Sequence, residues 1–131
     1  MLNKRHFLAG LTLTIALMAS APLAAMEKKS FDAKAFEAAQ AAGQPILVEV
    51  TAPWCPTCKA QAPILAKLGS QPKFQNVARF DIDFDSQKDL LRKFNVRMQS
   101  TLIVFKGTKE MARSTGDTNA GSIERLLEKS L

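Results

Sequence analysis

The pattern of apolar and polar positions divides the chain into a leading segment and one folded domain. A long apolar run lies within residues 1–25, whereas residues 26–131 alternate short apolar runs with amphipathic stretches. Runs of branched apolar residues are typical of strands, and apolar residues three or four apart are typical of helices. The predicted helices span about 32–42, 55–68, 86–94 and 119–131, and the predicted strands span 46–51, 77–83, 101–106 and 110–115.

The order of these elements predicts the fold class. Helices and strands alternate until the last two strands, which Gly107 and Thr108 join in a hairpin. We expect an α/β fold with a mixed central sheet of about four strands and helices on both faces. A length of 131 residues is enough for one such domain and too little for two. Residues suited to capping precede three of the helices: Ser30 or Asp32, Ser86, and Asn119 or Ser122.

Residues 1–25 are typical of a secretory signal peptide. A positive start containing Lys4 and Arg5 precedes an apolar run, and a stretch of small residues ends at Ala25. The apolar run is shorter than the roughly 20 residues that a membrane-spanning helix needs. We therefore expect export to the periplasm and cleavage after Ala25. The alternative is that the segment stays as an N-terminal membrane anchor, with the folded domain facing the periplasm.

Composition narrows the function classes. Without the leader, the domain carries 16 basic and 12 acidic side chains, which are scattered and show no aromatic-interleaved patch. This modest excess indicates a solvated surface, and nucleic acid is not an expected partner. The two cysteines, Cys55 and Cys58, exclude a disulfide-stapled mini-protein and a four-cysteine zinc site. The only histidine, His6, lies in the leader, so the mature domain has none to act as a base or ligand.

Cys55 and Cys58 are the candidate reactive residues of the domain. They lie three positions apart at the start of a predicted helix, a spacing at which a disulfide closes with little backbone movement. Unpaired N–H groups and the helix dipole favour a negative sulfur at a helix start. Cys55 is therefore the expected attacking thiolate, and Cys58, which is deeper in the helix, is the expected resolving thiol.

The domain resembles the thioredoxin family over residues 31–131. The resemblance lies in segments 46–50, 52–59 (Ala-Pro-Trp-Cys-Pro-Thr-Cys-Lys), 62–65, 77–83 and 101–106, and in Gly116. It implies the thioredoxin fold and exchange with protein thiols and disulfides, through a mixed disulfide on Cys55 that Cys58 resolves. No cofactor is implied, a monomer is expected, and a membrane-bound or periplasmic protein is the expected redox partner. The family's first strand is expected to be short or absent, because residues 26–29 alone precede the first helix.

The resemblance also assigns a role to Glu49. Thioredoxins carry a buried acid at this position, beneath the resolving cysteine, and a carboxyl group there can take the proton from Cys58 directly or through water. Arg79 matches the family's lysine near that acid. The alternative is that Glu49 is an outward-facing strand residue paired with a surface base. A charge within a branched-apolar strand favours the catalytic interpretation, because burying it is costly unless it has a role.

Five further residues are expected to bind substrate. In the family, the position of Trp54 flanks the active site and touches substrate; the alternative is that this aromatic side chain packs beside the turn. Thr57 stands where other members tune the reduction potential, and its hydroxyl brings no positive charge to the thiolate, so a reductase-like pair is expected rather than a strongly oxidising one. The expected set is Trp54, Pro56, Thr57, Gln99 and Ser100.

Ser100 departs from the family pattern. The family has a cis-proline directly before the strand at 101–106, facing the cysteine pair. A cis bond without proline costs about 2.5–4 kcal/mol, so we expect Gln99-Ser100 to be trans and peptide binding to differ from the family's mode. Loss of the shielding proline also opens an alternative function, in which the two cysteines bind or carry Cu(I) with help from Met98 or Met111.

Overall fold

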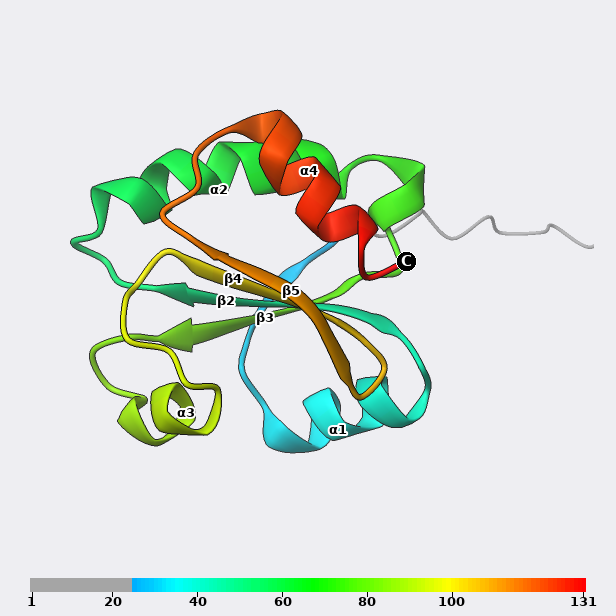
Figure 1. Ribbon diagram of the computed structural model, residues 1–131, viewed down its shortest axis with the longest axis horizontal. Coiled ribbons are helices and arrows are strands. Elements are labelled where there is room, and N and C mark those ends of the chain that lie inside the picture. Colours follow the sequence, from blue (N-terminus) through cyan, green and yellow to red (C-terminus); the bar gives the residue numbers. More distant parts are fainter. Residues whose placement is uncertain (1–24) are drawn as a thin grey trace, which may run out of the picture.

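A mixed sheet forms the centre of the structure, a computed structural model that describes residues 25–131 (Figure 1). The sheet has five strands in the order β1-β3-β2-β4-β5. The strands are β1 (Lys28–Ser30), β2 (Pro45–Thr51), β3 (Ala78–Asp83), β4 (Thr101–Lys106) and β5 (Lys109–Thr115). The helices are α1 (Ala33–Ala41), α2 (Pro56–Gly69), α3 (Lys88–Lys93) and α4 (Ala120–Glu128), with a 3-10 turn at Pro72–Phe74. The α/β class and the mixed sheet are confirmed.

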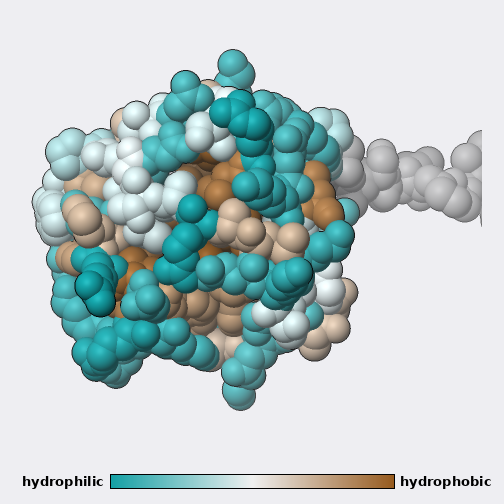
Figure 2. Space-filling view, viewed as in Figure 1, coloured by the Kyte–Doolittle hydropathy of each residue, from teal (hydrophilic) through white to brown (hydrophobic). Residues whose placement is uncertain are grey.

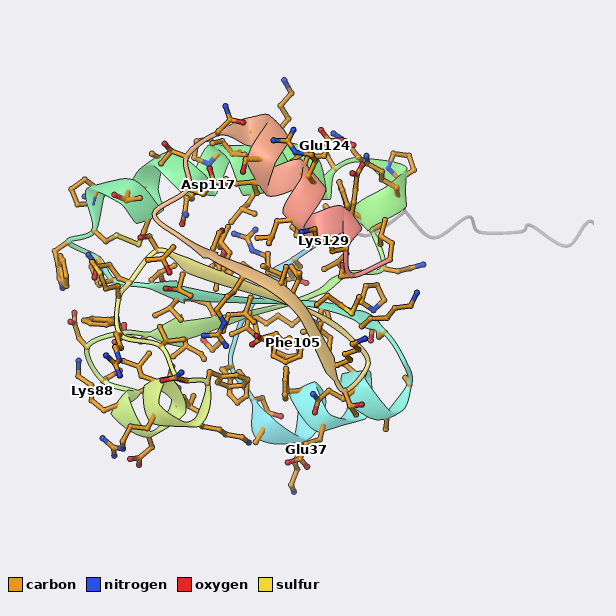
Figure 3. The ribbon with its side chains drawn as sticks, viewed as in Figure 1. Glu37, Lys88, Phe105, Asp117, Glu124 and Lys129 are labelled. Carbon is orange, nitrogen blue, oxygen red and sulfur yellow. A yellow bond between two sulfur atoms is a disulfide. The ribbon has the colours of Figure 1, made fainter. Side chains whose placement is uncertain are left out.

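Helices cover both faces of the sheet, with α2 and α4 on one face and α1 and α3 on the other (Figure 1). Strands β1, β3 and β2 run parallel, whereas β4 is antiparallel to both β2 and β5. Side chains alternate between the two faces along each strand, so β2 sends Val48 to the α1 face and Leu47 to the α2 face. Figure 3 shows the same separation, since Phe105 points from β4 toward α1 while Glu37 points away from the molecule.

Hydrophilic side chains cover much of the molecular face shown in Figure 2, and apolar residues are visible between them over the sheet. The apolar residues beneath divide into one core on each side of the sheet. The core on the α1 face contains Phe36, Ile46, Val48, Val50, Phe80, Ile82, Leu91, Phe94 and Ile103, and the core on the α2 face contains Leu47, Leu65, Leu68, Phe74, Leu102, Val104, Ile123 and Leu127. Two cores built on one sheet hold β2 rigidly between them, and β2 ends at the cysteine pair.

Strand β1 adds a fifth strand to the four that the pattern predicted. It is three residues long, exposed throughout, and parallel to β3, with Lys28 opposite Arg79. Three exposed polar residues at a sheet edge carry no apolar alternation, so the hydrophobic pattern predicts no strand here. The short first strand that the resemblance implies is confirmed. The strand matters to the site because it brings Lys28 to the sheet.

Two of the three predicted helix caps are confirmed. Asp32 and Asn119 each accept a hydrogen bond from the backbone N–H three residues later, at 2.7 and 2.9 Å. Ser86 is not a cap, since α3 begins two residues later and the N–H and hydroxyl of Ser86 both donate to Asp83. Ser86 bonds to the Asp83 carboxylate instead of capping α3, because that carboxylate can accept both hydrogen bonds at once.

The described chain begins close to the C-terminal end of α2. Met26 is buried, and its N–H donates to the Gly69 carbonyl at 3.1 Å, while Ala25 is exposed. The rest of the expected signal peptide lies outside the described residues. Between residues 25 and 131, no helix has both the length and the apolar character needed to cross a membrane.

Candidate active site

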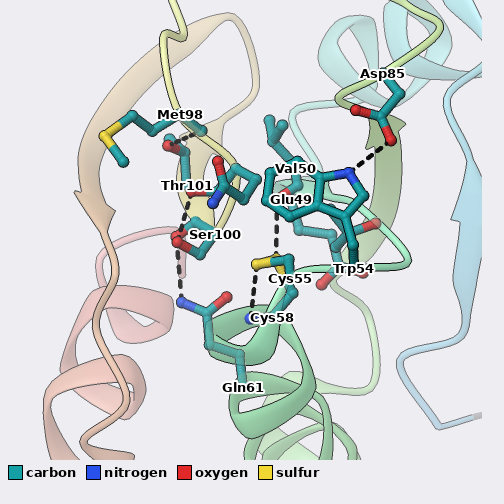
Figure 4. The surroundings of a disulfide bond; sticks show 12 residues. Glu49, Val50, Trp54, Cys55, Cys58, Gln61, Asp85, Met98, Ser100 and Thr101 are labelled. Carbon is teal, nitrogen blue, oxygen red and sulfur yellow. Dashed lines mark hydrogen bonds between the residues drawn. A yellow bond between two sulfur atoms is a disulfide. The ribbon is translucent and has the colours of Figure 1, made fainter.

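Cys55 and Cys58 are joined by a disulfide where β2 leads into α2 (Figure 4). Their Cα atoms are 5.3 Å apart. Cys55 is the N-cap of α2, and its Sγ accepts the backbone N–H of Cys58 at 3.1 Å. Pro56 is the first residue of the helix, where its missing N–H leaves no bond unmade. An N–H donor directed at a sulfur stabilises negative charge there, so this geometry favours the thiolate at Cys55 in the reduced protein.

Both cysteines are covered in the disulfide form. Cys55 is fully buried and Cys58 is 7% exposed, in a small cluster with Ala52. The exposed apolar side chains nearby are Trp54 and Met98, at 54% and 55% exposure. A partner therefore meets these neighbours first, and the side chains around Cys55 must move before an incoming thiol reaches its sulfur.

Trp54 is held in place although it is exposed. Its indole N–H donates to Asp85 at 2.9 Å, and its ring meets that of Phe84 edge-on, with 6.3 Å between the centroids. Asp85 and Phe84 belong to the loop that follows β3. Because the indole is anchored on that loop, its free surface stands at a defined position beside the disulfide (Figure 4).

Asp83 orders the loop that anchors Trp54. Its carboxylate accepts hydrogen bonds from the N–H and hydroxyl of Ser86, at 2.8 and 2.9 Å, and from the N–H of Asp85 at 2.9 Å. The bonds from Ser86 are the main reason that the pKa of Asp83 lies below its ordinary value of 3.8. The loop is thus tied to an ionised carboxylate.

Replacing Asp83 with alanine should destabilise the protein at neutral pH and have less effect in acid. A carboxylate with a depressed folded pKa stabilises the fold above its unfolded pKa, and the contribution is lost as the pH falls through the folded pKa. Urea midpoints of wild type and D83A, followed by Trp54 fluorescence, should differ at pH 7 and approach each other as the pH falls through the depressed pKa of Asp83, below 3.8. Glu37→Ala, an exposed change on α1, is the control; equal midpoints for D83A and wild type at pH 7 would contradict the prediction.

Ser100 faces the disulfide from the residues before β4 (Figure 4). Its φ is +59°, and no peptide bond among the described residues is cis, so the trans Gln99-Ser100 bond is confirmed. A left-handed residue other than glycine costs about 1–2 kcal/mol, which is less than the cost of a cis bond without proline. The chain therefore makes this turn through φ rather than through the peptide bond.

The Val50 carbonyl is shared between Ser100 and Cys58. It accepts the N–H of Ser100 at 2.7 Å, a donor that proline would lack, and Cys58 Sγ lies 3.9 Å from the same oxygen. A carbonyl oxygen has two lone pairs, so a reduced Cys58 thiol can also donate to it. Of the other predicted substrate contacts, Pro56 is exposed, while Thr57 and Gln99 are partly exposed.

Gln61 belongs to the site and was not predicted. It lies three residues after Cys58 on α2 and is 2% exposed. Its side-chain amide donates to the carbonyls of Ser100 and Asp117, at 3.2 and 2.8 Å. The sequence signal that could have indicated it is an amide on the buried face of a helix, where such a group needs partners.

Glu49 is buried beneath the disulfide, which rules out the outward-facing alternative. Its exposure is 2%, and it shares the α2 face of the sheet with Leu47 and Arg79. Both its oxygens accept bonds from the Arg79 guanidinium, at 2.9 to 3.2 Å, and Lys28 Nζ lies 3.1 Å from Oε1. Neither sulfur is among its hydrogen-bond partners in the described part of the chain. A proton transfer between Cys58 and Glu49 would therefore need a bridging water or a small shift of one of the two side chains.

Two cations and a second carboxylate complete this cluster, in which Glu49 and Arg79 are buried and Lys28 is exposed. Lys28 also lies 3.3 Å from Asp81, which accepts the Thr51 hydroxyl at 2.6 Å. Arg79 is itself buried, so its charge is compensated by Glu49 within the protein rather than by water. The cluster links β1, β2 and β3 under the redox pair.

The soft-metal alternative has few ligands in this arrangement. Within residues 25–131, no group of three or more His, Cys, Asp or Glu side chains is placed to hold a metal ion. Met98 lies in the loop before β4, on the same side of the molecule as the pair (Figure 4). The Thr115 end of β5 is the end near the site, because Thr115 pairs with Thr101, and Met111 lies toward the opposite end of that strand. Among residues 25–131, Cu(I) would thus find the two thiolates and no grouped third His, Cys, Asp or Glu ligand.

The comparisons with known proteins agree with this geometry. A family model described as Thioredoxin matches residues 24–129. The chain belongs to the thioredoxin family. It is 31% identical over 102 residues to Thioredoxin Asp f 29 of Aspergillus fumigatus, which covers 77% of this chain and 92% of the relative. It is 32% identical over 96 residues to Thioredoxin-2 of Saccharomyces cerevisiae, covering 72% of this chain and 89% of the relative.

A solved structure extends the likeness to three dimensions. The crystal structure of Trxlp from Edwardsiella tarda matches with a TM-score of 0.75 and 40% identity, over 77% of this chain and 98% of that protein. As a thioredoxin-family protein with a closed Cys55–Cys58 pair, the chain is a thiol–disulfide oxidoreductase.

Proposed function

We propose that this protein is an exported oxidoreductase that reduces protein disulfides in the periplasm, through a mixed disulfide on Cys55 that Cys58 resolves. The observation that carries the proposal is the Cys58 N–H directed at Cys55 Sγ, at 3.1 Å. That donor stabilises a thiolate on Cys55, and the thiolate is the form that attacks a disulfide. The leader at residues 1–25 supports export.

The reaction is balanced by two successive displacements. The Cys55 thiolate attacks one sulfur of the substrate disulfide, forms an S–S bond to it, and releases the other substrate sulfur as a thiolate that takes a proton. Cys58 then loses its proton and attacks Cys55 Sγ, which forms the Cys55–Cys58 disulfide and releases the second substrate thiolate. Two electrons pass to the substrate, and a membrane-bound or periplasmic dithiol must supply two more for the next cycle.

Glu49 supports the second displacement. The Cys58 thiol must lose a proton as it attacks, and Glu49 is the buried carboxylate on the α2 face of the sheet beneath it. Arg79 holds the carboxylate in place but cannot exchange protons itself, because a guanidinium stays protonated in proteins. Glu49, acting through water, is the acceptor that we assign.

The reductase direction is supported by the residues between the cysteines. Pro56 and Thr57 bring no charge to the Cys55 thiolate, whereas a strongly oxidising pair depends on a stabilised reduced form. The reduction potential tests this direction. Protein purified after expression of the full chain should equilibrate with dithiol buffers at a potential nearer to about −270 mV than to about −120 mV; a value near the latter would overturn the reductase assignment.

Export is tested separately by fractionation. When the full chain is expressed in a bacterium that has a periplasm, the mature protein should be released with the periplasmic fraction, and N-terminal sequencing should begin at Met26. Recovery of uncleaved protein in the cytoplasm would contradict export. Uncleaved protein in the membrane fraction would favour the anchored form.

A further inference from the structure

We propose that Gln61 is a positioning residue of the exchange site. It ties the Ser100 loop, defined as residues 97–100, to helix α2 and so determines how a protein disulfide docks at Cys55. Because this docking surface serves the same cysteine pair, the assignment rests on the proposed function.

The first support is the way Gln61 uses its amide. A buried amide must find partners, because leaving its donors unpaired is costly. Gln61 Nε2 directs both hydrogens at backbone carbonyls, those of Ser100 at 3.2 Å and Asp117 at 2.8 Å. These acceptors are 39 and 56 positions away in the sequence. One side chain therefore joins two distant loops to the helix that carries Cys58, and Figure 4 shows the bond to Ser100.

The second support is the backbone of Ser100, which depends on its bonds. Its φ of +59° is unfavourable for serine, so the surrounding structure must hold the residue there. The N–H of Ser100 donates to Val50, and its carbonyl accepts the Gly116 N–H at 3.0 Å as well as the Gln61 amide. Ser100 is thereby bound to β2, to α2 and to the turn after β5. Gln61 supplies the bond that fixes its distance from the redox helix.

The third support is the position of the Ser100 loop relative to the disulfide. Met98 and Trp54 stand on opposite sides of the cysteine pair, and both are more than half exposed (Figure 4). A polypeptide that reaches Cys55 has to lie against this loop, whereas a small disulfide needs only the local opening that exposes the Cys55 sulfur. Displacement of the loop should therefore slow exchange with proteins more than exchange with small molecules.

The test compares two substrates across matched variants. Gln61→Met keeps the length and volume of the side chain and removes its N–H donors. Reduced Q61M should react with insulin disulfides about fivefold to tenfold more slowly than wild type, while its rate with 5,5′-dithiobis(2-nitrobenzoate) stays within about twofold. The control is Gln44→Met. Gln44 also donates its amide to a backbone carbonyl, that of Asn76 at 2.9 Å, but it lies away from the site. Q44M should match wild type with both substrates.

The outcomes distinguish the role of Gln61 from the proposed function of the protein. Equal slowing with both substrates, or no slowing, would reduce Gln61 to a structural residue and overturn the inference. A wild-type protein that reacts with neither substrate would overturn the proposed function instead. If Q61M does not fold, Gln61→Asn carries the test, since it keeps the amide but shortens its reach. Q61N should also lower the ratio of the insulin rate to the small-disulfide rate, and an unchanged ratio would overturn the inference.

Discussion

Cys55→Ser should lower disulfide exchange at least about a thousandfold, whereas Cys58→Ser should accumulate mixed disulfides on Cys55. The asymmetry follows from the helix start. Cys55 Sγ receives the Cys58 N–H, so its thiolate is the stabilised nucleophile. Cys58 lies within the helix beside the Val50 carbonyl, and no N–H of residues 25–131 is directed at its sulfur, so it can complete a displacement but is not stabilised to begin one.

Non-reducing electrophoresis with mass spectrometry of the trapped peptides measures this difference. C58S incubated with a protein disulfide should give adducts that dithiothreitol releases, and each adduct should map to Cys55. The double variant C55S/C58S should give none and serves as the control. More abundant adducts on Cys58 in C55S than on Cys55 in C58S would reverse the assigned roles.

Arg79→Met should lower the free energy of unfolding by about 3 kcal/mol, because it leaves the buried Glu49 carboxylate without its main partner. Lys28, at 3.1 Å from Glu49, still compensates part of the charge of the Glu49 carboxylate. We therefore expect a loss of stability at the lower end of the range usual for breaking a buried ion pair. Replacing both members, as in Glu49→Leu/Arg79→Met, should recover most of the loss, since an apolar pair of similar volume needs no compensation.

Guanidinium chloride unfolding of the single and double variants measures these effects. Lys28→Met is the matched control, because its side chain is partly exposed at the edge strand and its ion pairs should contribute less than about 1 kcal/mol. An R79M protein as stable as wild type would contradict the prediction. The folded double variant also tests the role of Glu49. If it resolves mixed disulfides at the wild-type rate, the proton acceptor is another group.

The parts of the structure with local signals could be predicted from the sequence. The apolar run at β2 and the Trp54–Cys58 segment at the start of α2 each carry their signal within a few residues, and so does the Gly107 hairpin. The burial of Glu49 was indicated because a lone charge within an apolar strand is costly. These signals were sufficient for the α/β class and for the redox pair.

The remaining features depend on contacts between distant segments. Strand β1 is too short and too polar to show a period, and Lys28 meets Glu49 only after β1 pairs with β3. Gln61 finds its partners 39 and 56 positions away, so no local pattern could assign them. The sequence around Ser86 allows its hydroxyl either to cap α3 or to bond to Asp83, and in the structure it donates to Asp83.

The contact between Met26 and Gly69 would connect the proposed export with the stability of the fold. The Met26 nitrogen donates to the carbonyl of the last residue of α2, at the negative end of that helix. Cleavage after Ala25 would convert this nitrogen from an amide into an ammonium group, which interacts more favourably with a helix C-terminus. Maturation would then do more than release the protein from its leader, because the newly formed chain end would become the charged C-terminal cap of the helix that begins at the redox pair.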